Sequence, residues 1–445
     1  MKRLAAAAAA TVCAAALMAP TTAAATTPAP PRHLQHIVIM TQGGRSFDNY
    51  FGGTRGVNGI GQVPCQLQAT SDQRGCIGAH PITPRTIPSS LRTGPKAQRV
   101  SVDGGQMDGF VRAQTRPGSD GTAAMGYYLP QSLPLLHELV SRGVLFDNWF
   151  SGVPGGSLPN DLFDITAQPP VNAGIIPPQG WPDEQTIFDR LSAAGVSWRI
   201  YVQNYEPALT INTAATKQRL GGQLGRVPLL ALPRYLRSPA LMSHIVDMDQ
   251  YFRDLVSNRL PAVSYVVSTS ATEQTPRDPV KGHQLIRAVL NGLLASPAWQ
   301  SSALLVSWDS SGGWYDHVAP PRIDGADTGL RVPAFLISPF ARAGTINHTQ
   351  FDGASTLKLI ETTFDVAPLA ARDRQAGDPT AVLSFGLPQH PPRLVGVSTD
   401  APVVQPDRTT LVLGYLAVLT VALAACAVAL RSGRRRPVDE EAVAT

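Results

Sequence analysis

Residues 36–52 read HIVIMTQGGRSFDNYFG, an apolar run that ends in a polar segment with two adjacent glycines. A continuous apolar run, in contrast to an alternating one, is typical of a strand buried on both faces of a parallel sheet. Further runs of this kind recur along the chain, at 144–147, 263–267, 304–308 and 334–337. The sequence therefore predicts a sheet whose strands come from distant parts of the chain.

Helix-like stretches separate these runs, at 132–141, 186–194, 284–295 and 355–364. Strands that alternate with helices predict an α/β/α sandwich, with helices on both faces of a mostly parallel central sheet. No boundary inside 26–405 is sharp enough to divide it, so we expect one large domain there. Within it, the proline-rich residues 372–405 are expected to wrap around the domain and then to serve as a linker.

The first 25 residues have the features of a secretory signal peptide. Lys2 and Arg3 precede an alanine-rich apolar stretch, and the alanines at 23–25 form a small-residue cleavage site. An uncleaved N-terminal anchor is the alternative, but the apolar stretch is short and runs into a linker rich in threonine and proline. We expect residues 1–25 to be removed.

Residues 411–430 form a run of twenty residues without a charge, followed by four arginines within 431–445. A helix of that length spans the roughly 30 Å hydrocarbon core of a bilayer, and arginines remain on the cytoplasmic side. The alternative, a buried core helix, is rarely so uniformly apolar. The sequence predicts a single-pass protein of the cell membrane, with an extracytoplasmic ectodomain and a cytoplasmic tail at 431–445.

The cysteines are consistent with this location. Cys13 lies in the signal peptide and Cys426 in the membrane segment, which leaves Cys65 and Cys76 in the ectodomain. In an oxidising compartment this pair is expected to form a disulfide that closes one surface loop. A two-cysteine metal site is the alternative, but no matching histidine pair lies nearby.

The charge pattern excludes one class of partner. The formal net charge is +5, but six of the basic residues lie in the two terminal segments, so the ectodomain is nearly neutral. No block of lysines interleaved with aromatic residues is present, and we therefore expect no nucleic-acid binding. The protein partner and the oligomeric state do not follow from the sequence.

Polar residues that directly follow the apolar runs are candidates for a site, because ligands bind at the carboxyl ends of parallel strands. Ser157 follows two glycines and could act as a nucleophile if a base or a metal activated it. Asp309, Asp316 and His317 are ligand types that hold a divalent ion. From the residues alone, the structural interpretation is favoured: a turn serine, a loop-capping aspartate, and two side chains bonded to neighbouring backbone.

The segment 36–52 also carries a resemblance. It is similar to the opening signature of a bacterial phosphoesterase family that contains phospholipases C and an acid phosphatase and is related to the alkaline phosphatase superfamily. Other blocks resemble the family in family order, at 107–111, 125–128, 159–160, 260–265, 308–309, 315–318, 331–333 and 337–340. The resemblance covers most of the ectodomain and implies an alkaline phosphatase-like fold.

The resemblance also implies a mechanism. A hydroxyl nucleophile beside a divalent metal ion attacks a phosphate ester, such as a phospholipid, and water then hydrolyses the phospho-enzyme. Ser157 matches the nucleophile and Asp309 a metal ligand, and Asp316 and His317 are the side chains that could compensate for missing family ligands. Arg45 and Asn160 would contact the substrate.

Several positions depart from the family pattern. Where the family has a glutamate and an asparagine at the metal site, this chain has Gly43 and Gly44, and Ser310 replaces a second acidic residue. Gln274 and Gly353 stand where the family has histidines. Two hypotheses therefore remain open. One is an extracytoplasmic phosphoesterase that uses Ser157 and a metal. The other is a pseudoenzyme without a metal, which serves as a binding or assembly module at the cell surface.

Overall fold

The structure is a computed structural model that describes residues 33–61, 66, 76–82, 90–170, 175–213, 222–269, 273, 278–386 and 392–396. The chain divides into two compact units, Met1–Val395 and Gly396–Thr445, and the fold below is that of the first unit. The signal peptide at 1–25, the membrane segment at 411–430 and the tail at 431–445 lie outside the described residues. Among the described residues, no helix has the length and hydropathy needed to cross a bilayer.

The predicted disulfide is only partly within the described residues. Cys76 is disulfide-bonded, whereas Cys65 lies outside the described ranges. The pairing of these two cysteines therefore stays a prediction.

An eight-stranded sheet forms the centre of the first unit, with the strand order β13-β4-β12-β9-β1-β8-β6-β7. Its strands are β1 (His36–Gln42), β4 (Val144–Phe146), β6 (Trp198–Val202), β7 (Ile245–Asp247), β8 (Val263–Val267), β9 (Ser302–Trp308), β12 (Ala334–Ile337) and β13 (Thr345–Asn347). The central strand β1 pairs in parallel with β8 and β9. Within this sheet only β12 runs antiparallel to its neighbours, β9 and β4. The expectation of a mostly parallel sheet is confirmed.

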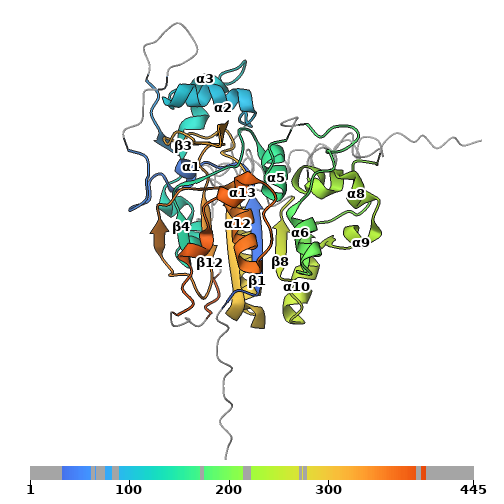
Figure 1. Cartoon of the computed structure of the whole chain (residues 1–445). Coiled ribbons are helices and arrows are strands. Elements are labelled where there is room, and N and C mark those ends of the chain that lie inside the picture. The colour runs from blue at the N-terminus through green and yellow to red at the C-terminus, as the bar shows by residue number, and fades with distance from the viewer. Residues whose placement is uncertain are drawn as a thin grey trace, which may run out of the picture. The chain divides into compact units, whose positions relative to one another are not determined.

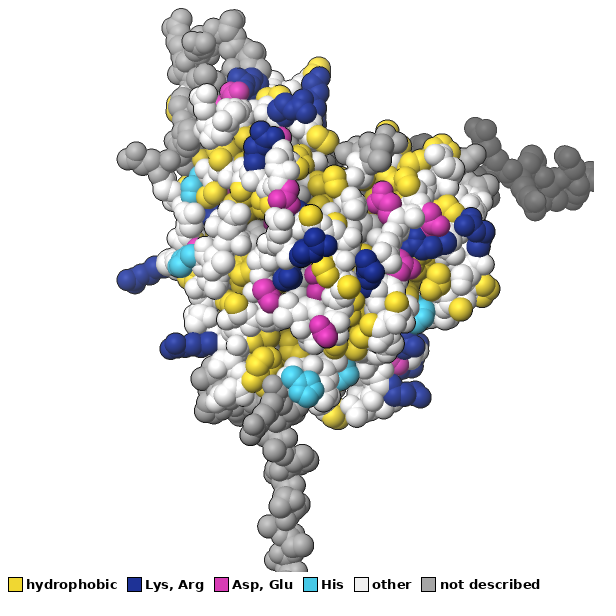
Figure 2. Space-filling model, in the orientation of Figure 1, with side chains coloured by type: hydrophobic (Ala, Val, Ile, Leu, Met, Phe, Trp, Pro, Cys, Tyr) yellow, Lys and Arg dark blue, Asp and Glu magenta, His cyan; other side chains and the backbone are white. Residues whose placement is uncertain are grey.

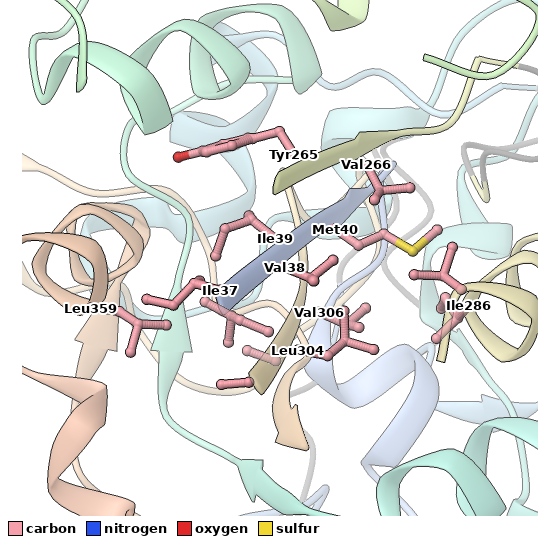
Figure 3. Close-up of a cluster of buried hydrophobic side chains, with 14 of the residues drawn as sticks. Ile37, Val38, Ile39, Met40, Tyr265, Val266, Ile286, Leu304, Val306 and Leu359 are labelled. Atoms are coloured by element: carbon pink, nitrogen blue, oxygen red, sulfur yellow. The ribbon is translucent and has the colours of Figure 1, made fainter. Parts of the chain in front are cut away.

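The core on β1 shows why a continuous apolar run was required. Successive side chains of a strand point to opposite faces, so a strand covered on both faces needs an apolar residue at every position. Figure 3 shows Ile37 directed toward Leu359 of α12 (Gly353–Phe364), and Met40 directed toward Ile286 of α11 (Pro279–Leu294). Ile37, Met40 and Ile286 are fully buried. Each such side chain contributes about 1.5–3 kcal/mol to folding.

Helices cover both faces of the sheet. On one face α12 packs against α5 (Ser157–Thr166), which also contacts α6 (Ile187–Ala193). On the other face α11 packs against α4 (Pro134–Val140) and α10 (Asp249–Val256). The remaining helices are short: α1 (Phe47–Phe51), α2 (Pro95–Val102), α3 (Phe110–Gln114), α7 (Gln223–Arg226), α8 (Pro233–Leu236), α9 (Pro239–Met242) and α13 (Ala371–Gln375).

The carboxyl ends of the parallel strands lie at one edge of the sheet, where further elements gather. Figure 1 shows α1, α2, α3 and α5 beyond the arrowhead of β1. A second hydrophobic cluster, which includes Met107, Phe110 and Trp314, holds part of this region together. Three two-stranded pairs complete the described structure: β2 (His80–Pro81) with β3 (Gly126–Tyr127), β5 (Trp149–Phe150) with β14 (Phe351–Asp352), and β10 (Arg322–Ile323) with β11 (Ala326–Asp327).

The segment predicted to wrap around the domain is partly helical. It contains α13 and a short 3-10 helix at Pro379–Val382. Arg372 of α13 forms an ion pair with Asp352, the N-cap residue of α12. The beginning of the segment, at Arg372, therefore packs onto the domain close to the start of α12.

Candidate functional site

Asp309 lies at the carboxyl edge of the sheet, directly after β9. Its backbone N–H donates to Gln42 O at the end of β1 (2.9 Å), and its side chain is buried. The carboxylate oxygen Oδ1 accepts from Gly44 N (3.2 Å) and from Ser310 Oγ (2.7 Å). Gly312, with φ +65°, packs so closely that a Cβ there would lie 2.0 Å from Gly44 O. The loops after β1 and β9 are therefore in close contact, and Asp309 Oδ1 accepts a hydrogen bond from each of them.

The other oxygen of Asp309 is paired with Arg226, at the end of α7. The same Nη1 atom donates to Asp161 Oδ2 (3.0 Å), and Nη2 donates to Thr41 O (2.8 Å). The Arg226 side chain is only 8% exposed. Burial raises the pKa of Asp161 and of Asp164 well above the usual range, and the Arg226 charge opposes this rise in both. A guanidinium therefore lies among three carboxyl groups, of which those of Asp161 and Asp309 are buried and that of Asp164 is half-buried.

Ser157 is the first residue of α5, placed by a turn that only glycine accommodates easily. Gly155 has φ +139°, and a Cβ on Gly156 would lie 2.8 Å from Thr93 Oγ1. The Ser157 Oγ atom is buried and has no hydrogen-bond partner within the described ranges. Side chains four residues apart share a helix face, so Ser157 and Asp161 lie on the same side of α5. Ser157 makes no hydrogen bond to Asp309. Asp161, on the same side of α5 as Ser157, and Asp309 both form an ion pair with Arg226.

The two residues expected to contact substrate have structural contacts. Arg45 is fully buried, with its guanidinium carbon 5.5 Å from the ring centre of Tyr50 and 5.0 Å from that of Trp314. Asn160 accepts from Val153 N (3.0 Å) and donates to Gly156 O (2.9 Å). Asn160 therefore holds the turn that precedes Ser157. A substrate contact of either residue stays a prediction.

Asp316 and His317 belong to a second buried cluster, which does not include Asp309. With Asp48 they form a group whose potential ligand atoms lie within 4.8 Å of one another. His317 Nδ1 lies 2.6 Å from Asp48 Oδ2. Arg331, fully buried, donates from Nη2 to Asp48 Oδ1 (2.9 Å) and from Nε to Asp316 Oδ1 (3.1 Å). This cluster, like the first, is built around a guanidinium.

The ionisation of the second cluster follows from its surroundings. Burial raises the pKa of Asp316 to about 6, although the Arg331 charge opposes the rise. For His317, burial lowers the pKa, but the hydrogen bond and charge of Asp48 outweigh this effect, and the net shift is upward. Arg331 also donates to Asp147 O (2.8 Å), so its charge is held firmly in place. These contacts give the cluster a structural role, in which it ties the loops after β1 and β9 to the start of β12.

The residues around Asp309 and Arg226, which form the first cluster, do not fit a divalent metal ion. A catalytic zinc normally needs three protein ligands, and harder ions need several oxygen ligands. Gly43 and Gly44 offer no side chain, and Asp309 is already paired with Arg226. A Cβ on Gly353 would lie 2.6 Å from Asp164 Oδ1, so the carboxylate fills the space where the resemblance expects a histidine.

The second cluster fits an ion no better. Asp48 Oδ2 already accepts from His317 N (2.8 Å), and Asp316 Oδ2 accepts from Asp48 N (3.1 Å). Arg331 supplies the positive charge that a cation would otherwise bring. A metal ion here would have to displace a fully buried arginine. The role of Asp316 and His317 as metal ligands stays a prediction that these contacts do not favour.

A mostly parallel central sheet between layers of helices, with Ser157 and Asp309 at its carboxyl edge, defines the class: an α/β protein with a polar site at that edge. The model of the Phosphoesterase family matches residues 34–367. This chain belongs to the Phosphoesterase family, as its opening segment predicts.

Relatives with curated names support this membership. Phospholipase C A of Mycobacterium tuberculosis is 30% identical over 430 residues, which cover 82% of this chain and 80% of the relative. Phospholipase C B of the same organism is 31% identical over 425 residues, with 81% and 80% covered. Non-hemolytic phospholipase C of Pseudomonas aeruginosa is 30% identical over 438 residues, with 82% of this chain and 60% of the relative covered.

Solved structures are more distant. The phosphonate monoester hydrolase of Agrobacterium radiobacter aligns with a TM-score of 0.40 and 10% identity, over 80% of this chain and 78% of that one. A protein of the alkaline phosphatase superfamily from Vibrio parahaemolyticus aligns with a TM-score of 0.36 and 14% identity, over 78% and 71%. At these low identities and TM-scores, neither structure is evidence about the site of this chain.

The sequence interpretation missed Arg226 and its partners on α5. Ser157, Asp161 and Asp164 stand at positions i, i+4 and i+7, which is the spacing of one helix face, so the two acids could have been found. Arg226 follows no apolar run and offers no such signal.

Proposed function

We propose that this chain is a non-hydrolysing member of the Phosphoesterase family, which serves as a binding or assembly module on the outer surface of the cell membrane. The observation that carries the proposal is the buried pair of Arg226 and Asp309. Asp309, the carboxylate that matches a metal ligand in the resemblance, is neutralised by a residue of the chain itself.

The electrostatics explain why the guanidinium excludes a cation. Two unit charges 4 Å apart interact by about 4 kcal/mol at an effective dielectric constant of about 20, and a divalent ion doubles the repulsion. Asp161 and Asp164 would offset part of this repulsion if ionised, but burial favours their neutral forms. A divalent ion would bind only after Arg226 had left, and its departure would leave the carboxylates without their partner.

A second candidate function is hydrolysis of a phosphate ester, for example of a phospholipid, through Ser157. One observation favours it: the Ser157 Oγ atom is buried without a hydrogen-bond partner in the described structure. In such a reaction the serine oxygen would bond to phosphorus, the alcohol would leave, and water would release the phosphate. Among the described residues, however, no base lies within hydrogen-bonding distance of this hydroxyl to accept its proton.

The proposed location rests on the sequence. The signal peptide at 1–25, the apolar segment 411–430 and the arginines that follow it support a single-pass protein with its C-terminus in the cytoplasm. Protease treatment of intact cells tests this. A tag at the C-terminus is expected to resist digestion until the membrane is permeabilised, whereas an ectodomain epitope is digested at once. The reverse pattern would refute the orientation.

A turnover measurement separates the two candidate functions. Full-length protein is assayed with p-nitrophenyl phosphate and p-nitrophenylphosphorylcholine across pH 5–9, with zinc, manganese, magnesium or calcium ions or with a chelator. We expect the wild type to match Ser157→Ala under every condition. Turnover that is present in the wild type and lost in Ser157→Ala would establish the hydrolase and end the first proposal.

A further inference from the structure

A cavity of about 390 Å³ lies at the edge of the sheet opposite Ser157 and Asp309. It is lined by Ile337 at the end of β12, and by Trp299, which lies just before β9. Ile337 is paired with Leu304 near the start of β9, whereas Asp309 follows the end of that strand. The cavity is therefore separated from the candidate site by the length of the sheet. Its volume is within the range of about 300–1,000 Å³ that small-molecule sites show.

The lining of the cavity has an apolar part and a donor part. Leu290 and Leu294 of α11 form an apolar wall together with Ile337. The indole N–H of Trp299 is buried, and it has no acceptor among the residues that the structure describes. A buried donor without an acceptor is costly, so a ligand that supplies an oxygen to it gains affinity.

Two arginines also line the cavity. Arg142 donates to Arg393 O (3.0 Å) and pairs with Glu138 (2.8 Å). Arg393 itself is exposed. With one acidic and two basic side chains, this group keeps a net positive charge. The lining therefore suits a ligand that combines an apolar part with an anionic group.

The chain leaves the described unit beside this cavity. Val395 donates to Asn291 Oδ1 (2.8 Å) and accepts from Asn291 Nδ2 (2.9 Å), so it is fixed to α11, the helix whose leucines line the cavity. Val395 precedes Leu411, where the apolar segment begins, by sixteen residues. An extended chain of that length spans at most about 55 Å. A membrane anchor at 411–430 would therefore hold Val395 within about 55 Å of the bilayer.

The surface near this exit is consistent with contact to a membrane. Leu394 is 59% exposed, and Phe385 is 41% exposed. Figure 2 shows hydrophobic side chains gathered at the lower edge of the face in view, at the end of the sheet where β1 begins in Figure 1. Exposed apolar side chains beside arginines are typical of surfaces that lie on anionic lipid.

We propose that this cavity binds one anionic phospholipid from the adjacent membrane leaflet. An acyl chain lies along Leu290 and Leu294, an oxygen of the lipid accepts from the Trp299 N–H, and the arginines hold the phosphate. The proposal rests on the membrane anchoring proposed above, but not on the absence of hydrolysis.

The cavity provides its own fluorescent reporter, Trp299. Full-length protein is reconstituted in nanodiscs of phosphatidylcholine that contain phosphatidylglycerol with brominated acyl chains, and tryptophan fluorescence is recorded. We expect quenching at least threefold greater than with brominated phosphatidylcholine at the same fraction. Trp299→Phe is expected to remove this difference, and Arg142→Gln combined with Arg393→Gln to reduce it. Arg259→Gln, an exposed control, is expected to leave it unchanged.

Two outcomes would overturn the proposal: equal quenching by the two brominated lipids, or a difference that persists in Trp299→Phe. Water-soluble short-chain phosphatidylglycerol and phosphatidylcholine repeat the comparison without a bilayer. If the protein does not enter nanodiscs, the anchoring proposal fails. The comparison of the two short-chain lipids then tests the cavity proposal, which is overturned by equal quenching or by a difference that persists in Trp299→Phe.

Discussion

Arg226 and Asp309 form a buried ion pair at the carboxyl edge of the sheet, although they are 83 positions apart in the sequence. The pair lies at the point where the loops after β1 and β9 meet α5 and α7. Under the function proposed above, this pair stands where the resemblance implies a contact between a carboxylate and a metal ion. The charge balance of the site is thus supplied by the chain itself.

Replacement of Arg226 by alanine should destabilise the fold strongly. Loss of one partner leaves a buried carboxylate without compensation, which typically costs about 3–5 kcal/mol. We expect a decrease of this size in the free energy of unfolding, measured by urea denaturation at pH 7. Arg259→Ala serves as the control: this side chain is exposed, and the change should be within about 0.5 kcal/mol. A decrease below about 1 kcal/mol in Arg226→Ala would mean that the ion pair contributes little.

Replacement of Arg331 should have a comparable effect, because it also leaves buried carboxyl groups behind. Arg331→Ala removes the partner of Asp48 and of Asp316, and we expect a loss of about 3–5 kcal/mol. Arg322→Ala is the matched control, since Arg322 also pairs with an aspartate but both side chains are about 70% exposed. Its loss should not exceed about 1 kcal/mol. Similar losses in both variants would contradict a structural role specific to Arg331.

The glycine at 312 offers a test of the close packing between the two loops. Gly312 and Gly325 both have positive φ, but only at Gly312 would a Cβ meet another atom, Gly44 O at 2.0 Å. Gly325→Ala should cost about 1–2 kcal/mol for the backbone conformation alone. Gly312→Ala should cost at least about 2 kcal/mol more, because the loops must move apart. Equal melting temperatures for the two variants would show that the loops are not in contact.

A buried glutamate predicts how stability depends on pH. Burial, together with Asp373, raises the pKa of Glu361 to about 8 from an ordinary value of 4.5. The folded state therefore binds a proton that the unfolded state has lost, and this contribution to stability falls as the pH rises from 4.5 to 8. In Glu361→Gln this part of the decrease should disappear, as measured by denaturation at pH 5, 6.5 and 8. Parallel pH profiles for the variant and the wild type would contradict the assignment.

The sequence predicted the centre of the sheet better than its edges. The ranges for β8 and β12 agree with the structure, because strands that are buried on both faces leave an uninterrupted apolar run. The strands β6, β7 and β13 were not predicted. β7 and β13 are the two edge strands, and Arg199 interrupts the apolar run of β6.

The candidate site was predicted in part for a related reason. Asp309 was found because it directly follows a strand, and Ser157 because it follows two glycines. Arg226 meets its partners only in the folded chain, since Thr41, Asp161 and Asp309 come from three distant segments. A tertiary ion pair of this kind leaves no local pattern. The departures at Gly43 and Gly44 indicated that the site differs from the family pattern, but not that Arg226 pairs with Asp309.

The metal content of the full-length protein tests the central claim most directly. Protein purified without chelator is analysed by inductively coupled plasma mass spectrometry, and its melting temperature is measured with EDTA and with zinc, manganese, magnesium or calcium ions. We expect less than about 0.1 ion per chain and no shift in the melting temperature, because a ligand that does not bind the folded state does not stabilise it. One tightly bound ion per chain, with a melting temperature that falls in EDTA, would contradict the role that we assign to Arg226.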